Sequence, residues 1–155
     1  MVVLNRSVNR LTFMAGVVLY AGEGTKSLES TRVELANSNP GILRLHIRFM
    51  EELGFPVEKL SARFQIHSIE EEPEAKNLWM KELRLGPRQF VRPMLKAPSG
   101  QVRRRTYTLQ LSYANTMLLF LLRYWTETIE ELVRTMNRQV ETDISSYGNR
   151  RLSSS

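Results

Sequence analysis

The sequence contains no cysteine, which excludes disulfide bonds and metal sites built on thiolates. This absence agrees with a reducing compartment, so we expect an intracellular location. Long apolar runs are missing too. The longest uncharged one in the first half covers residues 11–22, short of the ~20 residues that span a bilayer. No small-residue cleavage site follows it, so we expect no signal peptide and no membrane partner.

Acidic residues are absent from residues 83–126, whereas basic residues are frequent there. The basic residues of this stretch are Arg84, Arg88, Arg92, Lys96, Arg103, Arg104, Arg105 and Arg123. A long stretch of one sign builds a positive potential that favours a polyanion such as nucleic acid. A basic surface that only keeps the protein soluble is the alternative. An anionic membrane surface is a third possibility, but no basic amphipathic helix supports it.

The length of 155 residues suits one domain, and a hydrophobic fraction of 42% is globular rather than disordered. We expect a single domain over residues 1–138 and a flexible, serine-rich C-terminal tail over residues 139–155.

Hydrophobic periodicity predicts alternating helices and strands. The expected helices cover residues 8–22, 40–53, 71–83 and 116–136, and the expected strands cover residues 31–38, 60–68, 90–96 and 103–113. Residues 25–30 are a candidate companion strand. We expect Ser7 to cap the first helix and Gly24 to end it in a left-handed conformation. The first helix is apolar nearly all round, so we expect its own domain or a partner to bury it on every side.

The strands alternate between apolar and polar residues. This pattern predicts an α+β fold in which the helices cover one face of a sheet and leave the other face open. Inner positions include Leu78, Trp79 and Trp125 on the helices, and His46 is expected to be structural.

The open face has the side chains that proteins use to contact DNA bases. Arg matches guanine, Gln matches adenine, and Thr contacts the thymine methyl group. The candidate DNA-binding residues are Arg32, Glu34, Arg63, Gln65, His67, Arg103, Arg104, Arg105, Thr106, Thr108 and Gln110. A ten-residue strand here would be roughly 33 Å long, about one turn of B-DNA. An ordinary solvated sheet face is the alternative, although such faces usually also have Lys/Glu pairs.

Glu23 is the first acidic residue and lies at the carboxyl end of the first predicted helix. A carboxylate there meets the negative end of the helix dipole, at a cost of about 0.3–1 kcal/mol. A bound divalent cation would compensate, and so would Lys26 three residues later.

Residues 13–26 read Phe-Met-Ala-Gly-Val-Val-Leu-Tyr-Ala-Gly-Glu-Gly-Thr-Lys. They resemble the signature helix of the LAGLIDADG homing-endonuclease family, which ends in a small residue, an acid and a glycine. Residues 32–40 and the order of elements over residues 8–130 are similar to that family as well. Three features depart from it: Val18 stands where the family packs a glycine, Ala21 where many members have Asp, and the helix over residues 71–83 is absent from compact members.

The resemblance implies an antiparallel, saddle-shaped sheet that reads double-stranded DNA, and a homodimer through the helix over residues 8–22. Glu23 of each copy would bind Mg²⁺, and Lys96 or Lys26 would be the catalytic basic residue. The expected function is therefore Mg²⁺-dependent, sequence-specific cleavage of DNA in the cytoplasm, nucleoid or an organelle. The alternatives are a DNA-binding regulator without catalysis and a module that binds an acidic protein through its basic face.

Overall fold

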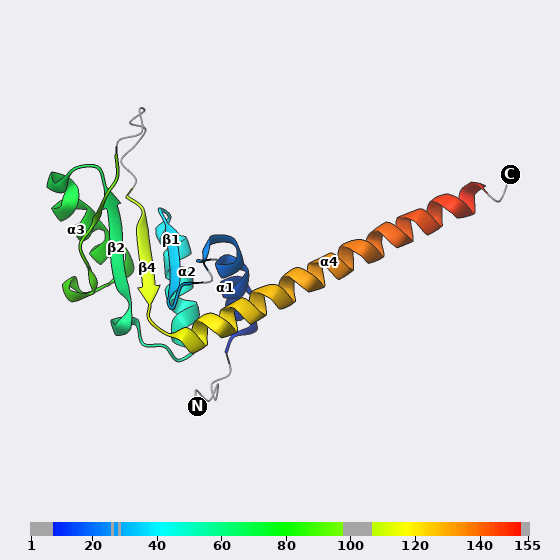
Figure 1. Cartoon of the computed structure of the whole chain (residues 1–155), viewed down its shortest axis with the longest axis horizontal. Helices are drawn as coiled ribbons and strands as arrows, with labels where there is room; N and C mark the ends of the chain where they lie inside the picture. Colours follow the sequence, from blue (N-terminus) through cyan, green and yellow to red (C-terminus); the bar gives the residue numbers. More distant parts are fainter. Residues whose placement is uncertain (1–7, 26, 28, 98–106, 153–155) are drawn as a thin grey trace.

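A computed structural model describes residues 8–25, 27, 29–97 and 107–152, with side chains to Glu141. The fold is α+β, with four helices and a four-stranded mixed sheet among the described residues (Figure 1). The helices are α1 (Arg10–Glu23), α2 (Pro40–Glu52), α3 (Glu72–Leu83) and α4 (Thr116–Leu152). The strands are β1 (Val33–Asn37), β2 (Ser61–Ile66), β3 (Met94–Leu95) and β4 (Leu109–Tyr113). Short 3₁₀ turns cover Val57–Lys59, Ile69–Glu71 and Pro87–Gln89.

The strands lie in the order β1-β4-β2-β3. Strand β4 is antiparallel to β1 and β2, but β3 runs parallel to β2, so the expectation of a wholly antiparallel sheet is wrong at this edge. The cause is the helix α3, which connects β2 to β3 as a crossover and returns the chain in the same direction. Strand β3 is only two residues long and follows Pro93, which cannot donate a ladder hydrogen bond.

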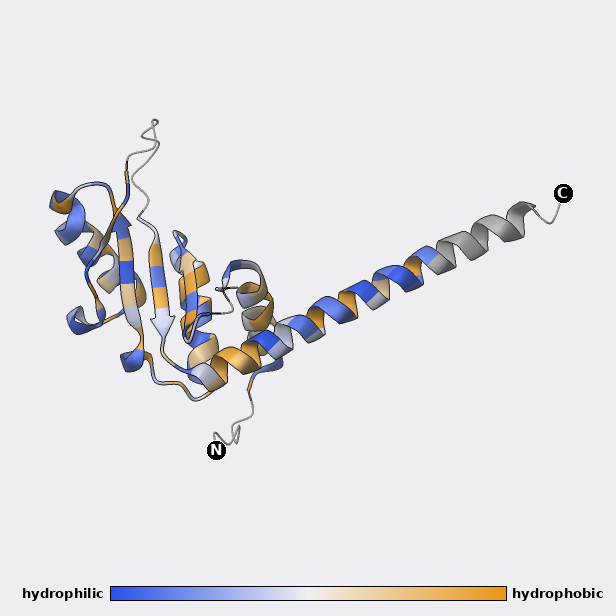
Figure 2. Cartoon of the chain, viewed as in Figure 1, coloured by the Kyte–Doolittle hydropathy of each residue, from blue (hydrophilic) through white to orange (hydrophobic). Residues whose placement is uncertain are grey.

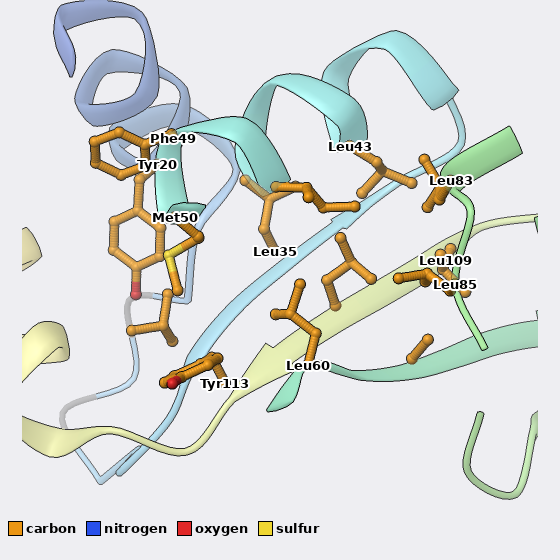
Figure 3. Close-up of a cluster of buried hydrophobic side chains, with 14 of the residues drawn as sticks. Tyr20, Leu35, Leu43, Phe49, Met50, Leu60, Leu83, Leu85, Leu109 and Tyr113 are labelled. Carbon is orange, nitrogen blue, oxygen red and sulfur yellow. The ribbon is translucent and has the colours of Figure 1, made fainter. Parts of the chain in front are cut away.

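Helices cover one face of the sheet, as the alternation predicted. Figure 3 shows Leu43 and Met50 of α2 in one layer of buried side chains with Leu35 of β1 and Leu109 of β4. Phe64 of β2 and Leu109 of β4 are fully buried in this core. The packing of α2 on β1 and of α3 on β2 places both helices on the far side of the strands in Figure 1.

Helix α1 differs from its expected form at both ends and on one side. Asn9 caps it, with Oδ1 accepting hydrogen bonds from the backbone N–H groups of Leu11 (2.9 Å) and Thr12 (3.3 Å), whereas Ser7 lies outside the described residues. Gly24 is extended (φ −76°, ψ 163°) instead of left-handed. The helix is not buried on every side within the chain, because Leu11 is 79% exposed.

Gly16 sets the distance between α1 and α2. A Cβ atom at this position would lie 2.2 Å from Cγ of Phe49, which is fully buried. Only glycine permits so close an approach of the α1 backbone to the aromatic ring. The tight glycine contact of α1 therefore lies within the chain, while Val18 on the other side of the helix is half exposed.

Three further expectations were wrong. No companion strand forms among the described residues between 25 and 30; only Gly24 forms an isolated bridge with Leu35. Leu78 is 41% exposed, so α3 buries Ala75, Trp79 and Leu83 without it. Helix α4 does not end near Met136 but continues into the predicted tail as far as Leu152.

His46 and the two tryptophans do lie in structural positions. His46 and Trp79 are almost fully buried. Trp125 contacts the ring of Phe13 edge-on, with ring centroids 4.9 Å apart. Burial lowers the pKa of His46 to about 4, so its imidazole is neutral in the folded protein at pH 7.

Candidate nucleic-acid interface

The polar side chains of three strands lie in register on the open face. Glu34 of β1 pairs with Ser112 of β4, which in turn pairs with Ser61 of β2. In the next polar row Gln110 of β4 pairs with Arg63 of β2. Strand alternation places all five side chains on the face opposite the core.

These side chains line a shallow hollow of about 280 Å³. Its lining residues are Arg32, Glu34, Ser61, Arg63, Val91, Gln110 and Ser112. All but Val91 are polar, whereas small-molecule pockets are mostly apolar and usually larger, roughly 300–1,000 Å³. The hollow therefore suits a polar group on an extended partner better than an enclosed small molecule.

The sequence predicted four of the lining residues as candidate contacts. Ser61 and Ser112 lie on the same face by the same alternation, which could have identified them. Val91 had no such signal, because it reaches the hollow through pairing beside β2, where its N–H donates to the carbonyl oxygen of Ala62 (3.0 Å).

Glu34 is anchored by hydrogen bonds within the sheet. Its two carboxylate oxygens accept from the hydroxyls of Thr25 and Ser112, each at 3.3 Å. The Ser61 hydroxyl donates to the carbonyl oxygen of Ser112, also at 3.3 Å. This network fixes the row of polar groups at the floor of the hollow and leaves Glu34 as its one acid.

The arginines of the open face form no ion pair among the described residues. The described ion pairs lie on the helices: Arg44–Glu82 (2.9 Å), Arg48–Glu52 (3.1 Å), and Arg134 with Glu130 (3.6 Å) and Glu131 (3.4 Å). Arg32 and Arg63 are exposed and have no carboxylate partner of this kind. Their guanidinium groups are thus available to an anion from outside the chain.

A second group of predicted residues lies toward the β3 edge. Gln65 pairs with Met94 of β3, and its N–H donates to the carbonyl oxygen of Thr108 (2.9 Å), which extends the polar rows by one step. His67 is exposed just beyond β2, with Nδ1 2.9 Å from the carbonyl oxygen of Lys96. Five other candidates, Lys26, Arg103, Arg104, Arg105 and Thr106, lie outside the described residues.

Glu23 and Lys96 lie at opposite edges of the sheet. Glu23 ends α1 and precedes Gly24, which bridges to β1, whereas Lys96 follows β3 and donates its N–H to Ile66 (2.9 Å). Three strand spacings of ~4.8 Å separate these edges. One chain therefore does not place Lys96 beside its own Glu23, as a shared reaction centre within one copy would need.

The carboxyl end of α1 is attached to the edge of the open face. The Tyr20 hydroxyl donates to the carbonyl oxygen of Thr25 (3.4 Å), and the Thr25 N–H donates to the backbone carbonyl oxygen of Glu34 (3.0 Å). Arg123 of α4 donates to the carbonyl oxygen of Ser27. Burial raises the pKa of the Tyr20 hydroxyl, so it stays a hydrogen-bond donor at neutral pH.

The residues of one chain do not fit Mg²⁺. No group of three or more His, Asp or Glu side chains in the described part of the chain could bind a metal ion together. Mg²⁺ needs near-octahedral oxygen ligands and usually takes at least one or two carboxylates in concert with a substrate phosphate. Glu23 alone is an exposed carboxylate at a helix end, so we derive no cleavage step from it.

Within the described residues, no helix is long and apolar enough to cross a membrane. No protein-family model, no curated protein and no solved structure matches this chain.

Proposed function

We propose that this protein binds double-stranded DNA through the open face of its sheet. The observation that carries the proposal is the pair of exposed arginines, Arg32 and Arg63, which flank a polar hollow without any described ion-pair partner. Arginines left free on a sheet face can contact phosphates or guanine edges, and Gln110, which pairs with Arg63 across the strands, offers an amide to adenine.

Two alternatives explain the face less well. A solvated sheet face usually offsets its cations with acids on neighbouring strands, but Glu34, the one acid among the described lining residues, is bound to hydroxyl groups. An acidic protein partner would need cations spread over a wide, partly apolar patch. The side chains here lie instead in rows at strand spacing, and β-ribbons and sheets that read DNA grooves present their side chains in this way.

Two copies of the chain would bind one target. Leu11, Met14 and Val18 recur at helical spacing along α1 and are between 48% and 79% exposed. We call these three residues the α1 stripe. A second copy packed against it would make a two-fold assembly, which fits a roughly palindromic DNA site.

The test begins with selection of bound DNA from a random pool, followed by measurement of affinity for the selected sequence. Arg63→Ala should weaken binding about 5- to 150-fold, the range for one good base contact of ~1–3 kcal/mol. Arg48→Ala is the matched control, because Arg48 is also an exposed arginine but lies on the helical side. Equal affinities of the two variants would refute the proposal.

Cleavage is tested with the same DNA. The selected sequence is incubated with Mg²⁺ to determine whether its strands are cut, and the same assay with Glu23→Gln determines whether Glu23 is needed. A product that disappears in Glu23→Gln while binding persists would add the endonuclease activity that the signature resemblance implies. Binding without any product leaves a non-catalytic DNA-binding protein.

A further inference from the structure

Helix α4 is much longer than the domain on which it packs. Its 37 residues extend about 55 Å at 1.5 Å per residue. Figure 1 shows that its first part crosses beside α1 and that the remainder projects away from the sheet. Every residue from 130 to 141 is exposed, so the folded chain does not cover this part of the helix.

The projecting part nevertheless continues the apolar face that packs on the domain. Leu122 is fully buried in the core, and Trp125 and Ile129 pack against it. The same three-and-four spacing then continues through Leu132 and Met136, and Figure 2 shows apolar bands recurring along the helix beyond the domain. Spacing of this kind is typical of a helix that packs along its length against another surface.

We call the apolar residues of the projecting part the α4 stripe; they are Leu132, Val133, Met136 and Val140. Each is between 49% and 59% exposed.

Charge is confined to the other side of the helix. With Leu122, Ile129 and Met136 in position a of a heptad, every charged residue from 126 to 141 falls in positions b, c or f. These charged residues are Glu127, Glu130, Glu131, Arg134, Arg138 and Glu141. The ion pairs of Arg134 with Glu130 and Glu131 form within this outer face. The seam of positions a, d, e and g contains no charge over this span, which favours an uncharged partner surface with apolar side chains for Ile129, Leu132 and Met136.

The chain itself presents such a surface. The α1 stripe is apolar and exposed, and Figure 1 shows that its helix lies beside the part of α4 from which the projection begins. The α1 and α4 stripes comprise seven side chains, each exposing roughly 100 Å². Their total, on the order of 700 Å², is close to the ~800 Å² that each partner buries in a standard interface.

We infer that the projecting half of α4 packs against a second copy of this chain. In a two-fold assembly each α4 stripe covers apolar surface of the other copy, including its α1 stripe, so both copies bury their exposed apolar residues at once. The inference rests on the two-copy assembly of the proposed function but not on DNA, because the interface is apolar and forms without it.

The test measures oligomeric state by analytical ultracentrifugation of the full chain without DNA, from 1 to about 100 μM. We expect the wild type to be a dimer. Met136→Glu places a charge in the seam and should raise the dissociation constant at least ~100-fold. Asn137→Glu places the same charge one residue later, on the outer face, and should leave the dimer unchanged. Both positions are exposed, so each variant should fold, and an unchanged circular dichroism spectrum would show that it does.

Three results would overturn the inference: a wild type that stays monomeric at 100 μM, equal dissociation constants for Met136→Glu and Asn137→Glu, or a dimer broken by Val18→Glu but not by Met136→Glu. The last would leave the two-copy assembly in place without α4. The DNA proposal is tested independently of the dimer, because Arg63→Ala should lose affinity for DNA while remaining a dimer.

Discussion

The contact between Gly16 and Phe49 makes a quantitative prediction about how α1 packs. In Gly16→Ala, the new methyl carbon would lie 2.2, 2.3 and 2.7 Å from three carbons of the Phe49 ring. Ordinary carbon–carbon contacts are ~3.5–4.0 Å, so the ring or the helix must move by more than an ångström. Phe49 is fully buried and its ring also contacts Phe13, with centroids 6.1 Å apart, so it has little room to move.

Two opposing effects decide the size of the change. Overpacking a core costs about 1–3 kcal/mol, and a clash this close belongs at the upper end. Alanine gains up to ~1 kcal/mol over glycine inside a helix. The net loss for Gly16→Ala is therefore ~2 kcal/mol, or roughly 4–8 °C in Tm for a domain of this size.

Gly22→Ala is the matched control, because it lies in the same helix and a Cβ there meets nothing within 4 Å. This variant should be as stable as the wild type or up to ~1 kcal/mol more stable. Urea denaturation followed by tryptophan fluorescence measures both, since Trp125 contacts α1 through Phe13. Replacing Phe49 with Leu in the Gly16→Ala background should recover part of the loss. If Gly16→Ala were within 0.5 kcal/mol of Gly22→Ala, the described packing of α1 would be wrong.

Two further predictions concern single side chains. Burial lowers the pKa of His46 to about 4, so between pH 6.5 and pH 4 this imidazole binds a proton only in the unfolded chain. The free energy of unfolding therefore falls as the pH drops through this window, by ~2 kcal/mol at pH 5. His46→Leu should remove this part of the difference between the urea midpoints at pH 7 and pH 5, and an unchanged difference would count against the prediction. Glu34→Gln keeps a hydrogen-bond acceptor and the shape of the side chain at the floor of the hollow but removes the negative charge. The affinity for DNA should therefore rise about 2- to 5-fold at low salt. Weaker binding of this variant in an anisotropy titration would argue against phosphates near Glu34.

Local patterns predicted most of the elements. The alternation over Ser61–Ile66 and around Leu109 was sufficient because one face of each strand is buried, and a shift of one residue would expose it. The predicted start of α2 at residue 40 was also correct, and Oδ1 of Asn39, the residue before it, accepts from the N–H of Gly41 (2.8 Å). The open face and its arginines followed directly from these strands.

Features that depend on distant parts of the chain could not be predicted in the same way. The direction of β3 is set by the crossover through α3, and a two-residue edge strand has too few side chains to indicate it. The sequence predicted Ser7 as the cap of α1, but Asn9, an equally suitable residue type two positions later, caps it instead. The separation of Glu23 from Lys96 required the strand order, which no local pattern contains.

The end of α4 was missed for a different reason. Beyond Met136 the residues are mostly polar, and we took this composition to indicate a tail. The helix nevertheless continues to Leu152, although residues 142–149 include several poor helix formers. Met136 and Val140 lie four residues apart across the predicted end, and this spacing could have indicated a longer helix.

The most direct measurement of the central claim is the salt dependence of binding to the selected DNA. Neutralising ~6–8 phosphates predicts that log K falls against log salt concentration with a slope of about −5 to −7, and Arg63→Ala should make it shallower by about 1 if Arg63 contacts a phosphate. A flat response between 50 and 200 mM salt would contradict DNA binding by this face.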